Sequence, residues 1–292
     1  MQLELTRNFL LVLCDIARDA GCAAMAYYDA PAAQDKADGS PVTLADLAAD
    51  AIIAERLQTA FPHTVRVSEE SASNRAPESL VQTEFFLIDP LDGTKEFIKR
   101  NGEFTVNIAL VRNGEAVAGV VHAPATGEMW MGAVGVGAFK CLADDLSTAD
   151  GRNDDEAKSP VSSQQREPSA GRRVPYPSRV RLQALHAPGV HDAAGLVVMG
   201  SRSHADDAAM SAYLADKRVA RFVAAGSSLK FCRLAEGVAD LYPRFTPTME
   251  WDTAAGHAVL SAAGGRVSLL DGSQLLYAKT QFRNPEFVAV AQ

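Results

Sequence analysis

Hydrophobic and polar positions divide the chain into a helical start, a sheet-rich middle and a second half in which strands and helices alternate. Residues 3–28 repeat apolar side chains at near-helical spacing, which predicts an amphipathic helix. A polar loop follows at 31–41. A second helix is predicted from Thr43 to about Thr59, and it ends before Pro62 because proline seldom continues a helix.

The middle of the chain predicts an antiparallel sheet. Phe85–Ile88 is a short apolar run of the length expected for a buried strand. Residues 105–111 and 116–122 flank the dipeptide Asn113-Gly114, which is typical of a tight hairpin. A third strand is predicted at 128–133, and we expect the glycines that follow it to mark a bend.

Residues 143–179 interrupt this pattern, because they are rich in Asp, Ser, Gln, Arg and Pro and hold almost no large apolar side chain. Such a segment buries too little apolar surface to offset its ordering entropy, so we predict a disordered surface insertion. A regulatory docking segment is the alternative. Beyond it we predict strands at 196–200, 219–224, 240–242 and 266–269 and helices at 206–214, 227–236 and 251–263.

These elements predict an α/β protein with an α+β N-terminal lobe and an α/β C-terminal lobe. A chain of 292 residues is long enough for one large domain or two lobes. We divide it into an N-terminal lobe at 1–140, the polar insertion at 141–182 and a C-terminal lobe at 183–292.

Composition narrows the classes of partner. A hydrophobic content of 47% with 22% charged residues is ordinary for a soluble globular protein. The net charge of −8 argues against nucleic-acid binding, which needs a basic face. A small anionic ligand is compatible with this charge where metal ions and a few basic side chains reverse the local field.

The cysteines and the N-terminus indicate a cytoplasmic protein. The four cysteines have no zinc-site spacing, and we predict small buried thiols in a reducing compartment. The first 24 residues lack the features of a signal peptide, and no stretch reaches the ~20 apolar residues that span a bilayer. Loose association with the inner membrane stays open. The cysteines are Cys14, Cys22, Cys141 and Cys232.

Two carboxylates stand on the turn that ends the Phe85–Ile88 strand. Asp89 and Asp92 lie within the segment DPLDGT, and buried acids cost free energy unless they meet a cation. The carbonyl of Leu91 can join them in the all-oxygen set that hard divalent cations prefer. The alternative is a proline turn whose acids cap a helix that begins near Thr94.

Two further segments supply acids. Glu69 and Glu70 follow a short apolar run, where they could simply be solvated surface. Trp251-Asp252 is predicted to open a helix, where Asp252 could merely favour the helix dipole. Neither segment alone identifies a site.

In this order, the acid pair, the segment DPLDGT and the segment WDTAAG at 251–256 resemble the inositol monophosphatase superfamily. The resemblance covers nearly the whole chain except the insertion. It implies a layered αβαβα sandwich of the inositol monophosphatase and fructose bisphosphatase type, with the active site at the junction of the lobes.

Finer segments resemble the bacterial 3′(2′),5′-bisphosphate nucleotidase branch of that superfamily. They are SRSH at 201–204, GSSLKF at 226–231 and LYPRF at 241–245. This resemblance implies a phosphatase that removes the 3′-phosphate of adenosine 3′,5′-bisphosphate to give AMP. The sulfated nucleotide 3′-phosphoadenylyl sulfate is a further candidate substrate.

The resemblance also implies the chemistry of the site. Two or three magnesium ions would activate a water and hold the phosphate, and lithium would inhibit by taking a magnesium position. Thr94, paired with Asp46, would orient and help deprotonate that water. Asp46 also fits a helix-capping arrangement with Thr43, and both roles can hold. The implied metal ligands are Glu69, Asp89, the Leu91 carbonyl, Asp92 and Asp252.

Substrate contacts follow the same resemblance. The amides of Gly93 and Thr94 stand where a helix begins, a favourable place for phosphate. His204 has a competing interpretation as an exposed helix-start residue without a ligand, and Lys95 receives no role. The remaining candidates are Lys230 and Arg244 for a second phosphate, and Ser203, His204 and Ser227 for ribose, base or phosphate.

Three alternatives remain at this point. A sister phosphatase acting on inositol monophosphate or a sugar phosphate is disfavoured by the segments SRSH and GSSLKF. A catalytically silent metal-binding protein has no need of Thr94 and Asp46. An interaction protein working through the insertion leaves the acidic segments unexplained.

Overall fold

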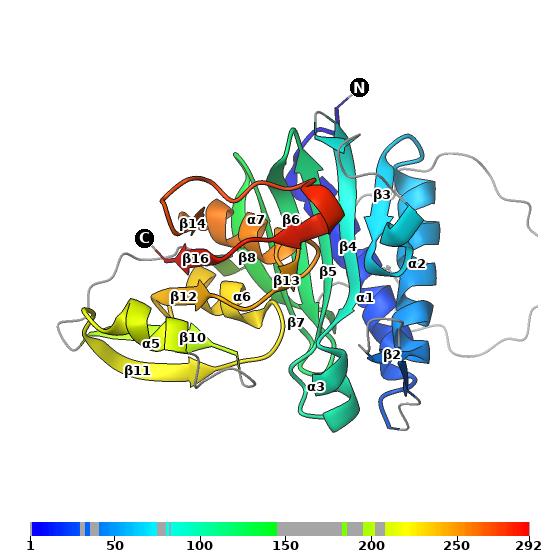
Figure 1. Cartoon of the computed structure of the whole chain (residues 1–292). Helices are drawn as coiled ribbons and strands as arrows, with labels where there is room; N and C mark the ends of the chain where they lie inside the picture. Colours follow the sequence, from blue (N-terminus) through cyan, green and yellow to red (C-terminus); the bar gives the residue numbers. More distant parts are fainter. Residues whose placement is uncertain are drawn as a thin grey trace, which may run out of the picture.

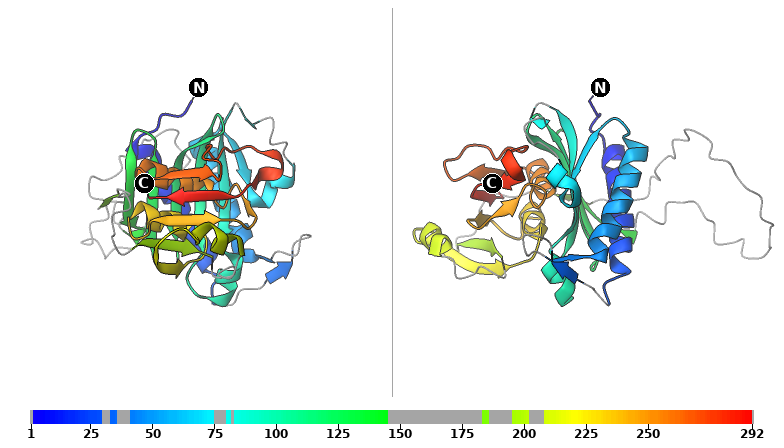
Figure 2. Two further views of the ribbon diagram at one scale, coloured as in Figure 1. Left: turned by 60° about the vertical axis from the view of Figure 1, so that its left-hand side comes forward. Right: turned by 45° about the vertical axis from the view of Figure 1, so that its right-hand side comes forward.

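The computed structural model confirms the layered architecture. Two long helices, α1 (Arg7–Met25) and α2 (Leu44–Ala60), cover one face of a large sheet. The helices α6 (Leu229–Ala235) and α7 (Ala254–Ala262) lie between this sheet and a smaller one (Figure 1). The short helix α5 (Ala208–Leu214) packs on the outer face of the smaller sheet, which completes five layers (Figure 2).

The described residues are 2–29, 33–35, 41–74, 80–81, 83–144, 183–185, 195–201 and 208–291. Most of the predicted insertion, from residue 145 to 182, therefore lies outside the described residues. Two predicted substrate contacts, Ser203 and His204, also lie outside them. In the described part of the chain, no helix is long and apolar enough to cross a membrane.

The large sheet has seven strands in the order β3-β4-β5-β6-β7-β8-β9. Only β3 and β4 pair in parallel, and the rest are antiparallel. The predicted hairpin is confirmed: Asn113 and Gly114 join β5 to β6 with positive φ angles of 52° and 80°. The strands are β3 (Val65–Ser68), β4 (Glu84–Asp92), β5 (Thr105–Arg112), β6 (Glu115–Ala123), β7 (Glu128–Ala133), β8 (Gly137–Leu142) and β9 (Gln183–Leu185).

The smaller sheet has the order β11-β10-β12-β16-β14, in which β10 pairs in parallel with both β11 and β12. The predicted elements of this half are present with ends shifted by a few residues. Its strands are β10 (Leu196–Gly200), β11 (Val219–Ala224), β12 (Leu241–Arg244), β14 (Arg266–Leu269) and β16 (Phe287–Val290). The remaining elements are β1 (Ala33–Asp35), β2 (Pro41–Thr43), η1 (Glu69–Asn74), α3 (Thr94–Lys99), β13 (Thr248–Met249), η3 (Thr280–Phe282) and β15 (Arg283–Asn284).

One hydrophobic core joins the two sheets. It contains Trp130 and Val121 from the large sheet together with Phe231 and Val259 from the central helices, and all four are at most 1% exposed. The central helix α7 lies directly on β6 because Gly119 has no side chain. A Cβ atom there would stand 2.4 Å from the carbonyl oxygen of Ala255.

The cysteines are free thiols, as predicted, but they do not share one environment. Cys14, Cys141 and Cys232 are buried. The prediction of burial is wrong for Cys22, which lies on the exposed side of α1. Helical periodicity turns position 22 away from the sheet that covers position 14.

Candidate functional site

The two aspartates of DPLDGT stand at the end of β4. Asp89 pairs with Asn107 of β5, Asp92 pairs with Thr105, and the register shifts between the two aspartates. The irregularity turns the strand, and Asp89 Oδ1 accepts a hydrogen bond of 3.0 Å from the amide of Leu91. A bulge of this kind changes the direction of side chains where pairing ends, and both acids lie at the C-terminal end of β4.

The acids of the three segments act on one another electrostatically. Burial raises the pKa of Asp89 well above its ordinary value, and the charges of Glu69, Asp92 and Asp252 raise it further. Burial likewise raises the pKa of Asp252, with Asp92 as the next cause. Glu69 reaches this cluster because η1 starts directly after β3, which lies parallel to β4.

These carboxylates form an all-oxygen donor set whose charges a hard divalent cation would offset, so the residues fit magnesium. Among the described residues, no three His, Cys, Asp or Glu side chains are arranged to hold a metal ion. The repelling acids bond to neighbouring donors instead: Asp252 Oδ2 accepts from the Met249 amide at 2.9 Å, and Asp92 Oδ2 lies 3.1 Å from Ser228 Oγ.

Asp46 contacts both of its predicted partners. Its Oδ2 accepts bonds of 2.8 and 2.7 Å from the amide and hydroxyl of Thr43, which confirms the capping box of α2. Its Oδ1 accepts a bond of 3.3 Å from Thr94 Oγ1 at the start of α3. Burial raises the pKa of Asp46, while the bonds from Thr43 oppose that rise.

Ser228 connects the end of β4 to the turn before α7 at the acid cluster, and the sequence did not single it out. Its hydroxyl lies 3.1 Å from Asp92 Oδ2 and 2.7 Å from the carbonyl oxygen of Asp252. Asn107 donates to the same hydroxyl at 3.0 Å. The bonds to Asp92 and Asn107 join residues more than 100 positions apart, so no local pattern could have revealed them.

Ser227, predicted as a substrate contact, bonds within the protein. Its hydroxyl lies 2.8 Å from the carbonyl oxygens of both Asp92 and Glu103. Its φ of 49° is unusual for a non-glycine residue. The neighbouring Gly93 must be a glycine, since its φ is 92° and a Cβ there would stand 2.3 Å from Ser227 Oγ.

Two predicted cations face one cavity at this junction, which we call the catalytic cavity. Lys230 is buried and donates to the carbonyl oxygens of Ala225 and Ser227 at 3.1 and 2.6 Å. Burial lowers the pKa of Lys230 to about 8, and the charge of Asp92 opposes that change. Arg244 donates to two backbone carbonyls of its own turn. The cavity of about 200 Å³ is lined by these cations and by Asp92, Gly93, Lys95, Ser201, Thr248 and Asp252, among others.

Asp252 does not open α7, contrary to the prediction of a helix from residue 251. The helix begins at Ala254, and Trp251 to Thr253 form a turn ahead of it. The β13 amide of Met249 holds the carboxylate in that turn. The side chain of Asp252 is therefore held by the loop ahead of α7, and Asp252 is not part of the helix.

Comparisons with known proteins agree with the geometry. The family model described as "Inositol monophosphatase family" matches residues 6–286. A 3′(2′),5′-bisphosphate nucleotidase CysQ of Escherichia coli (strain K12) is 41% identical over 279 residues, which cover 94% of this chain and 96% of the relative. The CysQ of Buchnera aphidicola is 35% identical and covers 98% of this chain and 94% of its own.

Solved structures agree in fold. The crystal structure of CysQ from Bacteroides thetaiotaomicron, a bacterial member of the inositol monophosphatase family, has a TM-score of 0.74 at 33% identity and covers all of both chains. A Thermotoga maritima IMPase has a TM-score of 0.68 at 23% identity, covering 97% of this chain and 92% of that one. At that identity the second likeness concerns the fold alone.

Proposed function

The chain belongs to the inositol monophosphatase family, and from this premise we propose that it is a 3′(2′),5′-bisphosphate nucleotidase. It hydrolyses the 3′-phosphate of adenosine 3′,5′-bisphosphate to AMP, with 3′-phosphoadenylyl sulfate as a further substrate. The observation that carries this function is the 41% identity to a curated nucleotidase over 94% of the chain. The acid cluster and the two cations in one cavity support it independently.

The metal ions are proposed to lie on the buried acids. The family is metal-dependent and generally uses Mg²⁺. Bound magnesium supplies Lewis-acid chemistry, because it offsets phosphate charge and makes water a stronger acid. We assign two or three ions and expect lithium to compete for one of them. The proposed ligands are Glu69, Asp89, the Leu91 carbonyl, Asp92 and Asp252.

Thr94 and Asp46 are proposed to move the proton of the attacking water. Thr94 Oγ1 takes a proton from the water as it passes its own to Asp46 Oδ1, 3.3 Å away. A hydroxyl alone is too weak a base, so the carboxylate is needed to complete the transfer. The raised pKa of Asp46 suits a group that must accept a proton.

Substrate recognition is proposed to use the cations of the catalytic cavity. An ammonium has three N–H donors, and two of those on Lys230 hold backbone carbonyls, so one is left for a phosphate oxygen. Arg244 stands on the same cavity and would share that phosphate. The amides of Gly93 and Thr94 are assigned to the reacting phosphate. The side chains assigned to the nucleoside part of the substrate are Ser203, His204 and Ser227.

The partner that follows is a small phosphorylated nucleotide, not a nucleic acid, since the chain carries a net charge of −8. We propose a cytoplasmic location, as expected for an enzyme of soluble nucleotides.

Phosphate release from three substrates tests the proposal. Adenosine 3′,5′-bisphosphate, inositol 1-phosphate and fructose 1,6-bisphosphate are compared with and without magnesium, and then with added lithium. We expect magnesium-dependent release that is strongest for the nucleotide and falls with lithium. Preference for inositol phosphate would instead identify the sister phosphatase, and no release from any substrate would revive the silent metal-binding protein.

A further inference from the structure

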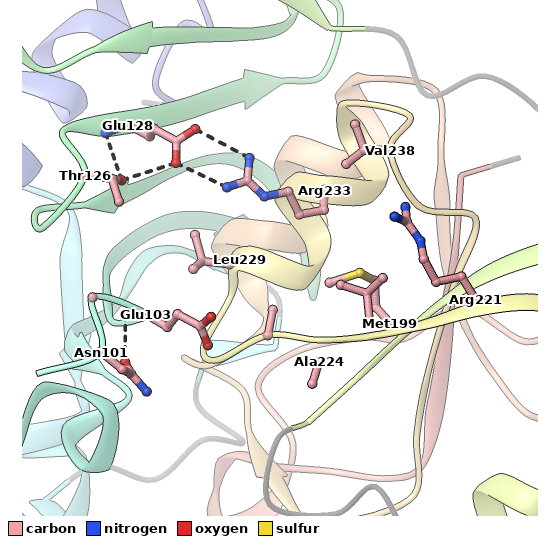
Figure 3. Close-up of a pocket in the computed structure, with 13 residues that line it drawn as sticks. Asn101, Glu103, Thr126, Glu128, Met199, Arg221, Ala224, Leu229, Arg233 and Val238 are labelled. Atoms are coloured by element: carbon pink, nitrogen blue, oxygen red, sulfur yellow. Dashed lines mark hydrogen bonds and ion pairs between the residues drawn. The ribbon is translucent and has the colours of Figure 1, made fainter. Parts of the chain in front are cut away.

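A second pocket lies on the other side of residues 225–228 from the catalytic cavity. Its volume is about 490 Å³, which is the size of a small-molecule site. It is bounded by β10, β11 and α6 and by the turns at 101–103 and 126–128 (Figure 3). We call it the interlayer pocket. It shares no lining residue with the catalytic cavity.

One side of the interlayer pocket is apolar. Met199 and Leu229 are only 2% and 6% exposed, and Val223 and Val238 extend this surface towards solvent. Val238 is 52% exposed, so it stands at the mouth. An apolar ligand body that displaced water from these side chains would gain free energy in proportion to the area covered.

The charged side chains of the pocket differ in whether they already form ion pairs with neighbouring residues. Arg233 pairs with Glu128 at 3.2 Å and with Glu236 at 2.8 Å, and Glu128 also accepts Lys140 at 2.6 Å. Arg221 has no ion pair with another described residue, and it lies across the pocket from Glu103 (Figure 3). The pocket therefore offers one uncompensated cation beside an apolar surface.

From these observations we propose that the interlayer pocket binds a small organic anion with an apolar body. The anion pairs with the guanidinium of Arg221, which is suited to carboxylate and phosphate groups alike. The body packs on Met199, Leu229 and Val238. This combination of an apolar surface with few polar groups is typical of small-molecule sites.

Residues 225–228, which separate the interlayer pocket from the catalytic cavity, bond to residues of the proposed active site. Glu103 Oε2 accepts the amide of Gly226 at 2.9 Å, and Lys230 holds the carbonyl of the wall residue Ala225 at 3.1 Å. Residues 225–228 in turn hold Asp92 through Ser228. A ligand that packs against Ala225 therefore acts on the segment that both sites share, and coupling of this kind is reciprocal.

Fluorescence of 1-anilinonaphthalene-8-sulfonate, an apolar organic anion, tests the site in the intact protein. We expect saturable binding that excess AMP does not abolish, because AMP occupies the other cavity and should change the dye affinity by no more than about fivefold. Arg221→Glu should weaken it about tenfold, which is the size of one lost charge pair, and Val238→Trp should block it by filling the mouth. Arg218→Glu is the matched control, because it makes the same charge change next to β11 and outside the pocket.

Two competitors identify the anion, and one assay tests the coupling. Displacement of the dye by benzoate indicates a carboxylate ligand, and displacement by phenylphosphonate indicates a phosphate ligand. Occupancy by the dye should change the KM for the nucleotide about fivefold in the native protein and not in Arg221→Glu. Complete competitive displacement by AMP, or equal affinity in Arg221→Glu and the native protein, would overturn the site. An unchanged KM at saturating dye would overturn the coupling.

Discussion

At the scale of single residues, the carboxylate of Asp46 shows how one side chain serves folding and chemistry together. One oxygen caps α2 through Thr43, and the other receives the hydroxyl of Thr94. The cap fixes the carboxylate in the first turn of a long helix, which leaves little freedom for the second oxygen. A local structural role thus pre-organises the proposed proton acceptor.

Replacing Thr94 by alanine removes the hydroxyl but neither the cap nor a proposed metal ligand side chain. We expect kcat to fall by about 100-fold or more, the usual contribution of positioned proton transfer. Magnesium affinity, measured by titration calorimetry, should stay within a few-fold of the native value. Thr94→Ser should restore most of the rate, and a serine variant as slow as the alanine variant would contradict the relay.

Replacing Asp89 by asparagine removes one charge from the buried acid cluster. The side-chain oxygen can still accept from the Leu91 amide, so the metal-free protein should be at least as stable as the native one. A ligand that binds only the folded state raises the Tm, and we expect magnesium to do so for the native chain but not for Asp89→Asn. Thermal unfolding with and without magnesium measures this. An equal rise in both proteins would remove Asp89 from the site.

At the scale of elements, the central helices are held by close backbone approach and by a buried polar network. Gly119 lets α7 lie on β6. His257 of α7 has its Nδ1 atom 2.8 Å from the hydroxyl of Tyr277, and Asn284 of β15 donates to Thr253 at 3.0 Å. These contacts fix the turn that carries Asp252 ahead of the helix.

Gly119→Ala should displace α7, because the new Cβ would meet backbone atoms of Ala255 that are not free to move aside. Overpacking of this kind costs about 3 kcal/mol at the upper end of its range. We expect the free energy of unfolding in urea to drop by that amount and turnover to fall with it. Unchanged stability would show that the helix and sheet can separate at little cost.

The pH dependence of stability should carry a contribution from His257. Burial lowers its pKa to about 4, whereas the unfolded chain has the ordinary value near 6.5. The unfolded state therefore binds the proton first, and the contribution to stability present above pH ~6.5 is lost as the pH falls towards 4. It amounts to about 3 kcal/mol.

His257→Gln removes this titration, which allows the contribution to be measured as a difference. We expect the native protein's advantage over the variant in urea unfolding to shrink by about 2 kcal/mol between pH 7 and pH 4.5. The acids of the metal site are present in both proteins, so their own titration cancels. A difference that is constant with pH would show that His257 does not titrate in this window.

At the scale of the whole molecule, the candidate site exists only where the layers meet. Asp89 and Asp92 come from the large sheet, Asp46 from α2, Ser228 from the start of α6 and Asp252 from the turn before α7. An ion network around Trp130 ties the same layers together, with Glu236 accepting from the indole at 2.9 Å and from Lys140 at 2.6 Å.

Removing residues 146–181 should leave this assembly and its turnover within about twofold of native, because long surface loops contribute little to stability. Lys140 of β8 pairs with Gln183 of β9, so the described strands on either side of the excised segment are neighbours and a Gly-Ser linker can join them. Steady-state phosphate release is the measurement, with two linker lengths as control. A large loss with both linkers would favour the docking role of the insertion.

Local patterns in the chain are enough to predict the features that depend on neighbouring residues. The hairpin at Asn113-Gly114 follows from the ease of positive φ there, and the cap of α2 follows from the spacing of Thr43 and Asp46. The order of the three acidic segments along the chain indicates the family without any geometry. Each of the segments that carry these signals spans only a few positions of the chain.

Features that depend on distant residues are fixed by packing and appear only in the folded chain. The bend predicted after β7 is present at residues 134–136, but the strand β8 that follows it was not predicted and depends on pairing with β7 and β9. Ser228 and Glu103 gained their roles from partners on other layers. Pairing and burial across more than 100 residues are set by packing, which no local pattern encodes.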